Sequence, residues 1–357
     1  MDDVTALAES QGGYVTRGQL RSLGSSDFGI AKAVRAGLLR KVRHGTYAPA
    51  ATYDRLEGDD RYRVNVRAVL DKLGPEYVAS HRSSCAVHRF GTFRVTNDEV
   101  DVTRRGGTRG RIEAGVRFHH GTVRDEDVIV VDGLPVTEPL RASIETTTLP
   151  TLRRDVEAGV VLLSEGMRLS GTTREQVVTL LDDRFGSWPS TSLARIAVTI
   201  ADGRCETVGE SRSLYLFARH KLPVPELQVW VRLPDGTLAR VDFLWLQHRT
   251  FGEFDGAVKY ALGDAAEPRR ALYDEKLRED ALRSYAMGAA RWGWVDLDGS
   301  RSASTARRIA ATLEQSVRLY GKSRIEIPVV DPAALDQSVV SAEVLAATRR
   351  LESLTAG

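Results

Sequence analysis

The chain has 357 residues, of which 42% are hydrophobic and 27% are charged, and its formal net charge is +2. This composition is typical of a folded protein with two or three domains and excludes a disordered chain. Because the net charge is close to zero, a surface for nucleic acid requires a local concentration of basic residues. The two cysteines, Cys85 and Cys205, lie too far apart in sequence for a zinc motif, and we expect both to be buried and reduced.

The apolar pattern argues against a membrane or secreted protein. No stretch approaches the roughly 18 uninterrupted apolar residues that a membrane-spanning helix needs. The first residues, Met1-Asp2-Asp3, lack the basic and apolar segments of a signal peptide. We therefore expect a cytoplasmic protein that has no membrane partner.

Short helices separated by glycines, and then a hairpin, are predicted in the first fifty residues. Thr16 and Ser26 are typical helix N-caps, and Gly45 favours a tight turn between two strands. The expected helices cover residues 4–9, 17–23 and 26–35, and the expected strands cover residues 38–43 and 46–48. Three short helices and a hairpin in this order predict a winged helix-turn-helix.

The remainder of the chain predicts a mixed middle region and an α/β region, so the fold class is α+β and multidomain. An exposed helical connector is expected at 54–73. In the middle region we expect strands near 99–104, 115–119, 127–131 and 134–136, and helices at 80–89, 139–147, 151–168, 172–183 and 190–201. In the third region we expect strands 226–233, 238–246, 250–255 and 289–295, and helices 207–220, 269–286, 303–320 and 341–354. The predicted domains are 1–53, 54–200 and 201–300, with a helical extension at 301–357.

The first domain is more basic than the chain as a whole. Residues 15–47 contain seven lysines and arginines but only one acid, Asp27. Such a local excess fits the phosphate backbone of double-stranded DNA, with the helix from Ser26 in the major groove and the hairpin on phosphates or the minor groove. The residues expected to contact DNA are Arg17, Ser25, Ser26, Lys32, Arg35, Arg40, Lys41, Arg43 and His44. The alternative is that the serines only cap helices and the basic residues form a solvated face.

A family resemblance supports this interpretation. The run LAESQGGYVTRGQLRSLGSSDFGIAKAVRAGLLRKVRHGTYAPA, with its patterns Thr-x-x-Gln-Leu and Gly-Leu-Leu-x-x-Val-x-x-Gly-x-Tyr, resembles the N-terminal domain of AbiEi-type antitoxins. The resemblance implies a winged helix, a cognate toxin of a type IV toxin–antitoxin system, and repression of the protein's own operon by binding promoter repeats. The segment ASHRSSCAVHRFG at 79–91 resembles the region next to this module in actinobacterial relatives.

Three acids are expected to gather on one face of a hairpin in the third region. If strands 238–246 and 250–255 are joined symmetrically, Asp242 lies directly opposite Glu253. Asp255 is two residues beyond Glu253 and therefore points to the same face, while Val241, Phe243 and Phe254 would bury the other face.

Carboxylates that lie this close repel one another unless a bound cation or a proton neutralises part of their negative charge. Their hard oxygen atoms suit Mg²⁺ or Mn²⁺, which could activate water for hydrolysis of a phosphodiester bond. Lys259 could orient that water or stabilise the transition state. Glu210, in the preceding helix, is a candidate fourth ligand.

A plain salt-bridged sheet is the alternative. In the same register Arg240 would face Asp255, and Arg278 or Lys276 could pair with the other acids. Asp274 and Arg278 are four residues apart on one helix, where an ion pair is the ordinary outcome. On the residues alone, the metal site and the ion-pair network stay equally open.

Residues 207–296 also resemble the PD-(D/E)XK nuclease superfamily, and within it the small endonuclease-like domains related to very-short-patch-repair enzymes. The matching positions are Asp242-Phe243, Glu253-Phe254-Asp255-Gly256, Lys259, Asp274 and Arg278, and Leu282, Gly288 and Arg291 follow in step. The resemblance implies a restriction-endonuclease-like fold with catalytic Asp242, Glu253, Asp255 and Lys259, and a metal held by Asp242, Glu253, Asp255 and Glu210. Asp255 occupies the position of the lysine that gives the superfamily name its letter K. Lys259 occupies a position at which relatives often have histidine.

Three functions therefore stay open at this point. The first is a DNA-targeted, metal-dependent endonuclease. The second is a non-enzymatic antitoxin and autorepressor whose nuclease-like domain is an inactive interaction module. The third is a restriction or repair component that acts on damaged or foreign DNA.

Overall fold

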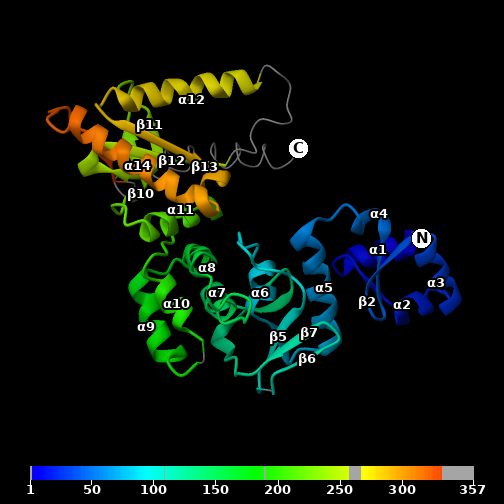
Figure 1. Cartoon of the computed structure of the whole chain (residues 1–357). Coiled ribbons are helices and arrows are strands. Elements are labelled where there is room, and N and C mark those ends of the chain that lie inside the picture. The colour runs from blue at the N-terminus through cyan, green and yellow to red at the C-terminus, as the bar shows by residue number, and fades with distance from the viewer. Residues whose placement is uncertain (1, 108, 189, 257–266, 332–357) are drawn as a thin grey trace. The chain divides into compact units, whose positions relative to one another are not determined.

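The computed structural model describes residues 2–107, 109–188, 190–256 and 267–331, with side chains of the helix that begins at Glu267 described from Glu275 onward. The chain divides into two compact units, residues 1–199 and 200–357, whose elements are labelled in Figure 1. In the described part of the chain, no helix combines the length and the apolar character needed to cross a membrane. Both cysteines are buried and unpaired, as expected.

The first unit begins with three helices and a three-stranded sheet. The helices are α1 (Asp2–Ser10), α2 (Arg17–Ser22) and α3 (Asp27–Arg35), and the strands are β1 (Val15–Thr16), β2 (Leu39–Arg43) and β3 (Thr46–Pro49), in the order β1-β3-β2. Thr16 caps α2 in a reciprocal capping box with Gln19, and the side chain of Ser26 accepts a hydrogen bond from the Gly29 N–H to cap α3. The predicted helices and hairpin strands are confirmed. Strand β1 was not predicted, because two residues carry no readable alternation.

The rest of the first unit contains a six-stranded sheet and further helices, of which α5 and α6 pack on the sheet. The helices are α4 (Ala50–Tyr53), α5 (Gly58–Leu73), α6 (His81–Val87), α7 (Pro139–Thr147), α8 (Val156–Ser170), α9 (Arg174–Phe185) and α10 (Ser192–Ala197). The strands are β4 (Tyr77–Ala79), β5 (Val100–Arg104), β6 (Arg111–Glu113), β7 (Val116–His119), β8 (Val128–Val131) and β9 (Leu134–Thr137), in the order β6-β7-β5-β4-β9-β8. The expected strands and helices of this region are present, and β4 and β6 are additional.

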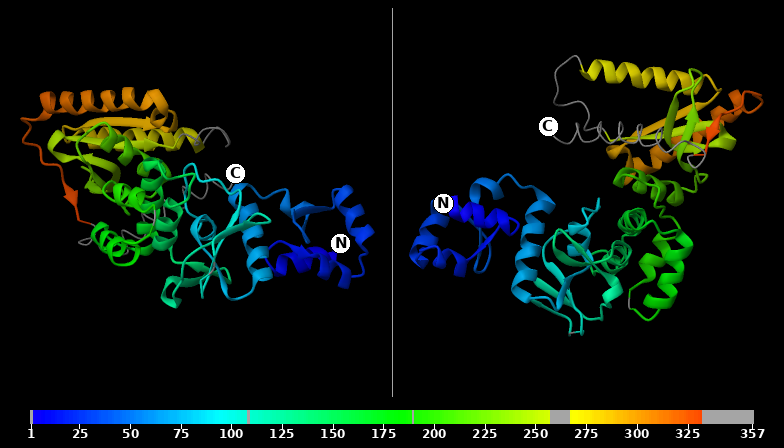
Figure 2. Two further views of the ribbon diagram at one scale, coloured as in Figure 1. Left: turned by 60° about the horizontal axis from the view of Figure 1, so that its bottom comes forward. Right: turned by 180° about the vertical axis from the view of Figure 1, so that it is seen from behind.

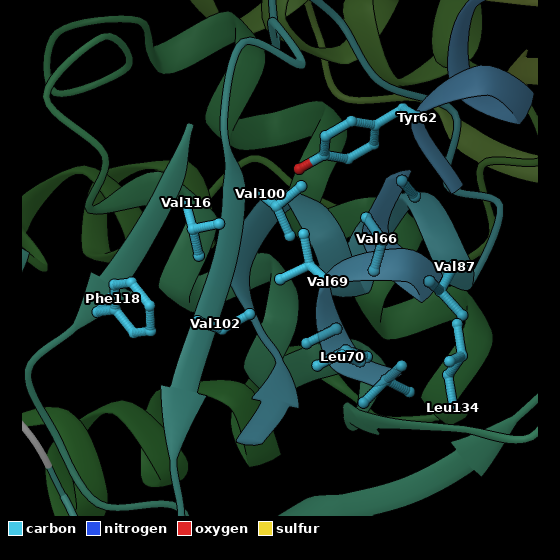
Figure 3. Close-up of a cluster of buried hydrophobic side chains, with 13 residues drawn as sticks. Tyr62, Val66, Val69, Leu70, Val87, Val100, Val102, Val116, Phe118 and Leu134 are labelled. Carbon is cyan, nitrogen blue, oxygen red and sulfur yellow. The ribbon is translucent and has the colours of Figure 1, made fainter. Parts of the chain in front are cut away.

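Helix α5 is part of the core, so its prediction as an exposed connector is wrong. Tyr62, Val66, Val69 and Leu70 recur at helical spacing and pack against buried side chains of the sheet, including Val102 (Figure 3). Val64 and Ala68, on another side of the helix, are buried against Tyr14, and acidic and basic residues lie between these buried positions. This mixture lowers the average hydropathy of the segment and conceals its buried side.

The segment 79–91 contributes a buried polar core to this unit. His81 has a left-handed backbone (φ 50°), and its N–H donates to Glu145 Oε2 at 3.2 Å. Its ring stacks on that of His119 with centroids 3.4 Å apart, and His119 Nε2 lies 2.6 Å from Asp101 Oδ1. Burial, and then the charge of His119, hold the pKa of His81 well below its usual range. Because His81 and Asp101 are almost fully enclosed, we interpret this network as structural.

The second unit is a five-stranded sheet with helices on both faces. Its strands are β10 (Glu226–Arg232), β11 (Leu238–Trp245), β12 (Thr250–Asp255), β13 (Gly288–Gly293) and β14 (Val329–Val330), in the order β13-β12-β11-β10-β14. Its helices are α11 (Val208–Arg219), α12 (Glu267–Arg283), α13 (Trp294–Leu297) and α14 (Gly299–Tyr320). Figures 1 and 2 show α12 on one face and α11 with α14 on the other.

The predicted elements of this unit up to residue 320 are confirmed, whereas α13 and β14 are additional. Helix α14, which was predicted as part of a separate extension, packs Ala306, Ile309 and Leu313 into the core beside the sheet. The helix expected at 341–354 and the expected catalytic Lys259 lie outside the described residues.

The predicted hairpin register is confirmed, but one detail of its faces is wrong. Phe243 pairs with Gly252 and Trp245 with Thr250, as the symmetric connection predicts. Phe243 and Phe254 share one hydrophobic cluster, whereas Val241 belongs to the cluster on the other face. The regular alternation breaks at Asp242, whose neighbour across the sheet, Gln228, has a left-handed backbone (φ 54°).

Candidate nucleic-acid interface

Helix α3 has one buried side and one solvent-facing side. Ile30 is 4% exposed and packs into the small core of the first three helices, together with Ala33 and Val34. On the opposite side, Phe28, Ala31, Lys32 and Arg35 are exposed. Positions three, four and seven residues apart form one stripe along a helix, so these four side chains present a single surface.

Three of the predicted DNA-contacting arginines are already engaged within the protein. Arg17 Nε donates to Asp27 Oδ1 at 2.7 Å, and Arg40 Nε donates to Asp54 Oδ1 at 2.8 Å. Arg43 is half-buried and donates to the carbonyl oxygen of Ala114 at 3.0 Å. Each of these three arginines therefore already has a partner within the protein.

The remaining predicted residues are distributed over α3 and the hairpin. Lys32 and Arg35 on α3, and Lys41 and His44 on the hairpin, are exposed, and none of them forms an ion pair with another described residue. Ser26 is occupied as the cap of α3, and the Ser25 N–H donates to Leu20 O at 3.0 Å. Two basic surfaces, one on α3 and one on the hairpin, remain available to phosphate oxygens.

The second candidate site is the acidic group in the second unit. Asp242 Oδ2 accepts a hydrogen bond from the Phe254 N–H at 2.9 Å. Glu253 is 9% exposed, and its two oxygens pair with Arg278 at 2.6 Å and with Arg291 at 2.8 Å. The predicted alternative in which Arg278 pairs with an acid is thus confirmed.

Glu210 is enclosed beside these acids at the start of α11. Its carboxylate accepts hydrogen bonds from the Glu206 N–H at 2.9 Å, from Thr207 Oγ1 at 2.8 Å and from Gln228 Nε2 at 2.8 Å. Burial, and then the charge of Asp242, raise the pKa of Glu210 to about 7. Burial also raises the pKa of Asp242 to about 6, with a further contribution from Glu253.

The carboxylates of Glu253 and Glu210 are occupied by protein partners in this arrangement. Both oxygens of Glu253 are engaged by arginines, and both oxygens of Glu210 accept hydrogen bonds. Among the residues that the structure describes, no three histidine, cysteine or acidic side chains are placed to share a metal ion. Asp255 is partly buried at the end of β12. The predicted metal ligands therefore do not form an assembled site.

Two partners of this cluster were not foreseen. Arg240, expected opposite Asp255, forms an ion pair with Glu206 at 2.6 Å. Arg291 reaches Glu253 because β12 and β13 are parallel neighbours that place the two residues in register. A parallel pairing across a helical crossover leaves no signal in local sequence, so the sequence could not identify Arg291 as the partner.

Comparison with known proteins gives information mainly about the N-terminus. Two Mycobacterium tuberculosis proteins, "Uncharacterized protein MT2308" from strain CDC 1551 / Oshkosh and "Uncharacterized protein Rv2248" from strain H37Rv, are 28% identical to this chain over 248 residues, covering 69% of it and 84% of each relative. The crystal structure of the RV2827C protein from Mycobacterium tuberculosis aligns with a TM-score of 0.37 at 16% identity, covering 59% of this chain and 78% of that one. Residues 2–50, which contain α3 and the hairpin, match the family described as "Transcriptional regulator, AbiEi antitoxin".

Proposed function

We propose that this chain is a DNA-binding transcriptional regulator of the antitoxin type, and that its first fifty residues act as a winged helix-turn-helix. One observation carries the proposal: in the segment that matches antitoxin regulators, α3 exposes Lys32 and Arg35 beside a basic hairpin. A helix with this exposure and charge suits the major groove of double-stranded DNA. Such a regulator would act in the cytoplasm, where its operon and a cognate toxin are found.

In this proposal α3 and the hairpin contact different parts of the DNA. The N-terminal half of α3 meets base edges, with Ser25 and Ser26 beside the phosphates at its start. Lys41 and His44 on the hairpin contact the backbone and contribute affinity on any sequence. Arg17 and Arg40 pair with Asp27 and Asp54, and Arg43 joins the hairpin to the carbonyl oxygen of Ala114 between β6 and β7.

For the second unit we propose a non-enzymatic role. A metal-dependent nuclease is the second candidate, and one observation favours it: in addition to burial, the charge of Glu253 raises the pKa of Asp242, and the charge of Asp242 raises the pKa of Glu210, so the three carboxylates lie near one another. Mg²⁺ or Mn²⁺ would have to displace Arg278 and Arg291 from Glu253 before it could bind there.

The proposal is tested with the full chain and the duplex that lies immediately upstream of its own coding sequence. Fluorescence anisotropy should show tighter binding to that duplex than to a shuffled duplex of equal composition. The double variant Lys32→Ala, Arg35→Ala should lose at least about tenfold in affinity, since it removes two groove-facing cations. Lys72→Ala, which removes an exposed charge from the end of α5, is the control and should bind normally.

Two results would contradict the proposal. The first is equal affinity of the wild-type protein for the upstream and the shuffled duplex. The second is full binding by the double variant of α3.

A further inference from the structure

Phe28 has a position that the folding of α3 does not explain. Its side chain is 73% exposed, although it lies in the first turn of a helix whose core contacts are made by Ile30. Exposed aromatic rings of this size are unfavourable in water and contribute nothing to the core. A partner that covers the ring would turn this unfavourable exposure into binding energy.

The surroundings of Phe28 indicate the chemistry of that partner. Lys32 lies one turn further along the same stripe, and the guanidinium carbon of Arg35 is 6.0 Å from the centroid of the Phe28 ring. An apolar ring flanked by two cations suits a surface that is anionic but carries an apolar group. Within the described residues, neither cation forms an ion pair that would neutralise this stripe.

We infer that Phe28 is a specificity-determining residue that contacts the 5-methyl group of a thymine in the major groove. The inference rests on the proposed function, and it names what the first turn of α3 recognises. In the major groove the thymine methyl is the one apolar group on the base edges, and N-terminal residues of recognition helices are those that reach it. Lys32 and Arg35 then hold the flanking phosphates or guanine acceptors.

The test uses a duplex that the wild-type chain selects from a random-sequence library, made again with each thymine in turn replaced by uracil. Uracil pairs like thymine but lacks the methyl group. Losing one buried methyl group should weaken wild-type binding about fourfold at the position that Phe28 contacts. Phe28→Ala should bind the thymine duplex more weakly and should not distinguish thymine from uracil at that position.

Lys32→Ala is the matched control from the same stripe. It should bind every duplex more weakly but keep the thymine preference, because it loses a charge and not the ring. Thermal melting of Phe28→Ala should match the wild type, since the ring is exposed and outside the core.

The outcomes separate this inference from the proposed function. If Phe28→Ala keeps the full preference for thymine, or binds the selected duplex as tightly as the wild type, Phe28 does not read a methyl group while DNA binding stands. If the wild-type chain selects no duplex at all, the proposed function fails, and the inference fails with it.

Discussion

The variant Glu253→Gln tests whether this carboxylate serves its two arginines or a metal ion. The Glu253 side chain is 11% exposed, and each arginine partner is 33% exposed. Removing one member of a fully buried ion pair costs about 3–5 kcal/mol, whereas an exposed pair contributes at most about 1 kcal/mol. Because this site lies between those limits, we expect the free energy of unfolding of the second unit to fall by about 2 kcal/mol.

The sign of this change separates the two interpretations when EDTA is present. If Glu253 is held by Arg278 and Arg291, the neutral amide removes the carboxylate partner of Arg278 and one of the carboxylate partners of Arg291, which keeps Glu275 and Glu279, and stability falls. If Glu253, Asp242 and Glu210 formed a metal site, removing one negative charge in the absence of metal would relieve repulsion and raise stability.

Urea unfolding monitored by tryptophan fluorescence is a suitable assay, because four of the five tryptophans lie in the second unit. The matched control is Glu279→Gln. The Glu279 side chain is 24% exposed, and its carboxylate lies 3.0 Å from Arg291. This variant should lose less than about 1 kcal/mol of unfolding free energy. The reasoning is refuted if Glu253→Gln is stabilised in EDTA and Mn²⁺ raises the midpoint of the wild type alone.

Three further predictions concern single positions. Lys41→Ala should reduce the slope of log affinity against log salt concentration by about 0.9, measured by anisotropy on duplex DNA. Arg40→Ala should reduce this slope less, because Arg40 is already paired with Asp54. Equal reductions in the two variants would contradict this distinction. Because burial and the charge of Asp242 raise the pKa of Glu210 from 4.5 to about 7, its stabilising contribution is complete below pH 4.5 and is lost as the pH rises through 7. Glu210→Gln should remove this loss, on the order of 3 kcal/mol in urea unfolding across that range, and an unchanged pH profile would count against the assignment. Gly209→Ala should destabilise the second unit by about 2 kcal/mol in the same assay, since the added Cβ would overlap the ring of Phe254, and unaltered stability would show that the ring moves freely.

Sequence reasoning succeeded where the signal was local. The caps at Thr16 and Ser26 act within three residues of where they stand, so they marked the starts of α2 and α3. The hairpin register depended on a short, symmetric connection, which is why the pairing of Phe243 with Gly252 could be predicted. The match of residues 2–50 to antitoxin regulators agrees with the resemblance inferred from the same stretch.

Sequence reasoning failed where the outcome depended on which distant surfaces meet. Side chains on α5 are buried because a sheet formed by later residues covers them. The sequence likewise contains no sign that Arg43 donates to the carbonyl oxygen of Ala114, which is 71 residues away.

The sequence by itself determined the order of helices and strands, the caps, the hairpin register and the basic character of the first module, because each depends on neighbours along the chain. Tertiary structure decided which charges remain available. Arg17, Arg40 and Glu253 are each paired with a residue brought close by folding. The ring of Phe28 is exposed because Ile30, and not Phe28, is the residue of α3 that is buried in the core. Ion pairs and burial depend on distances in space, and those distances are set when the elements pack.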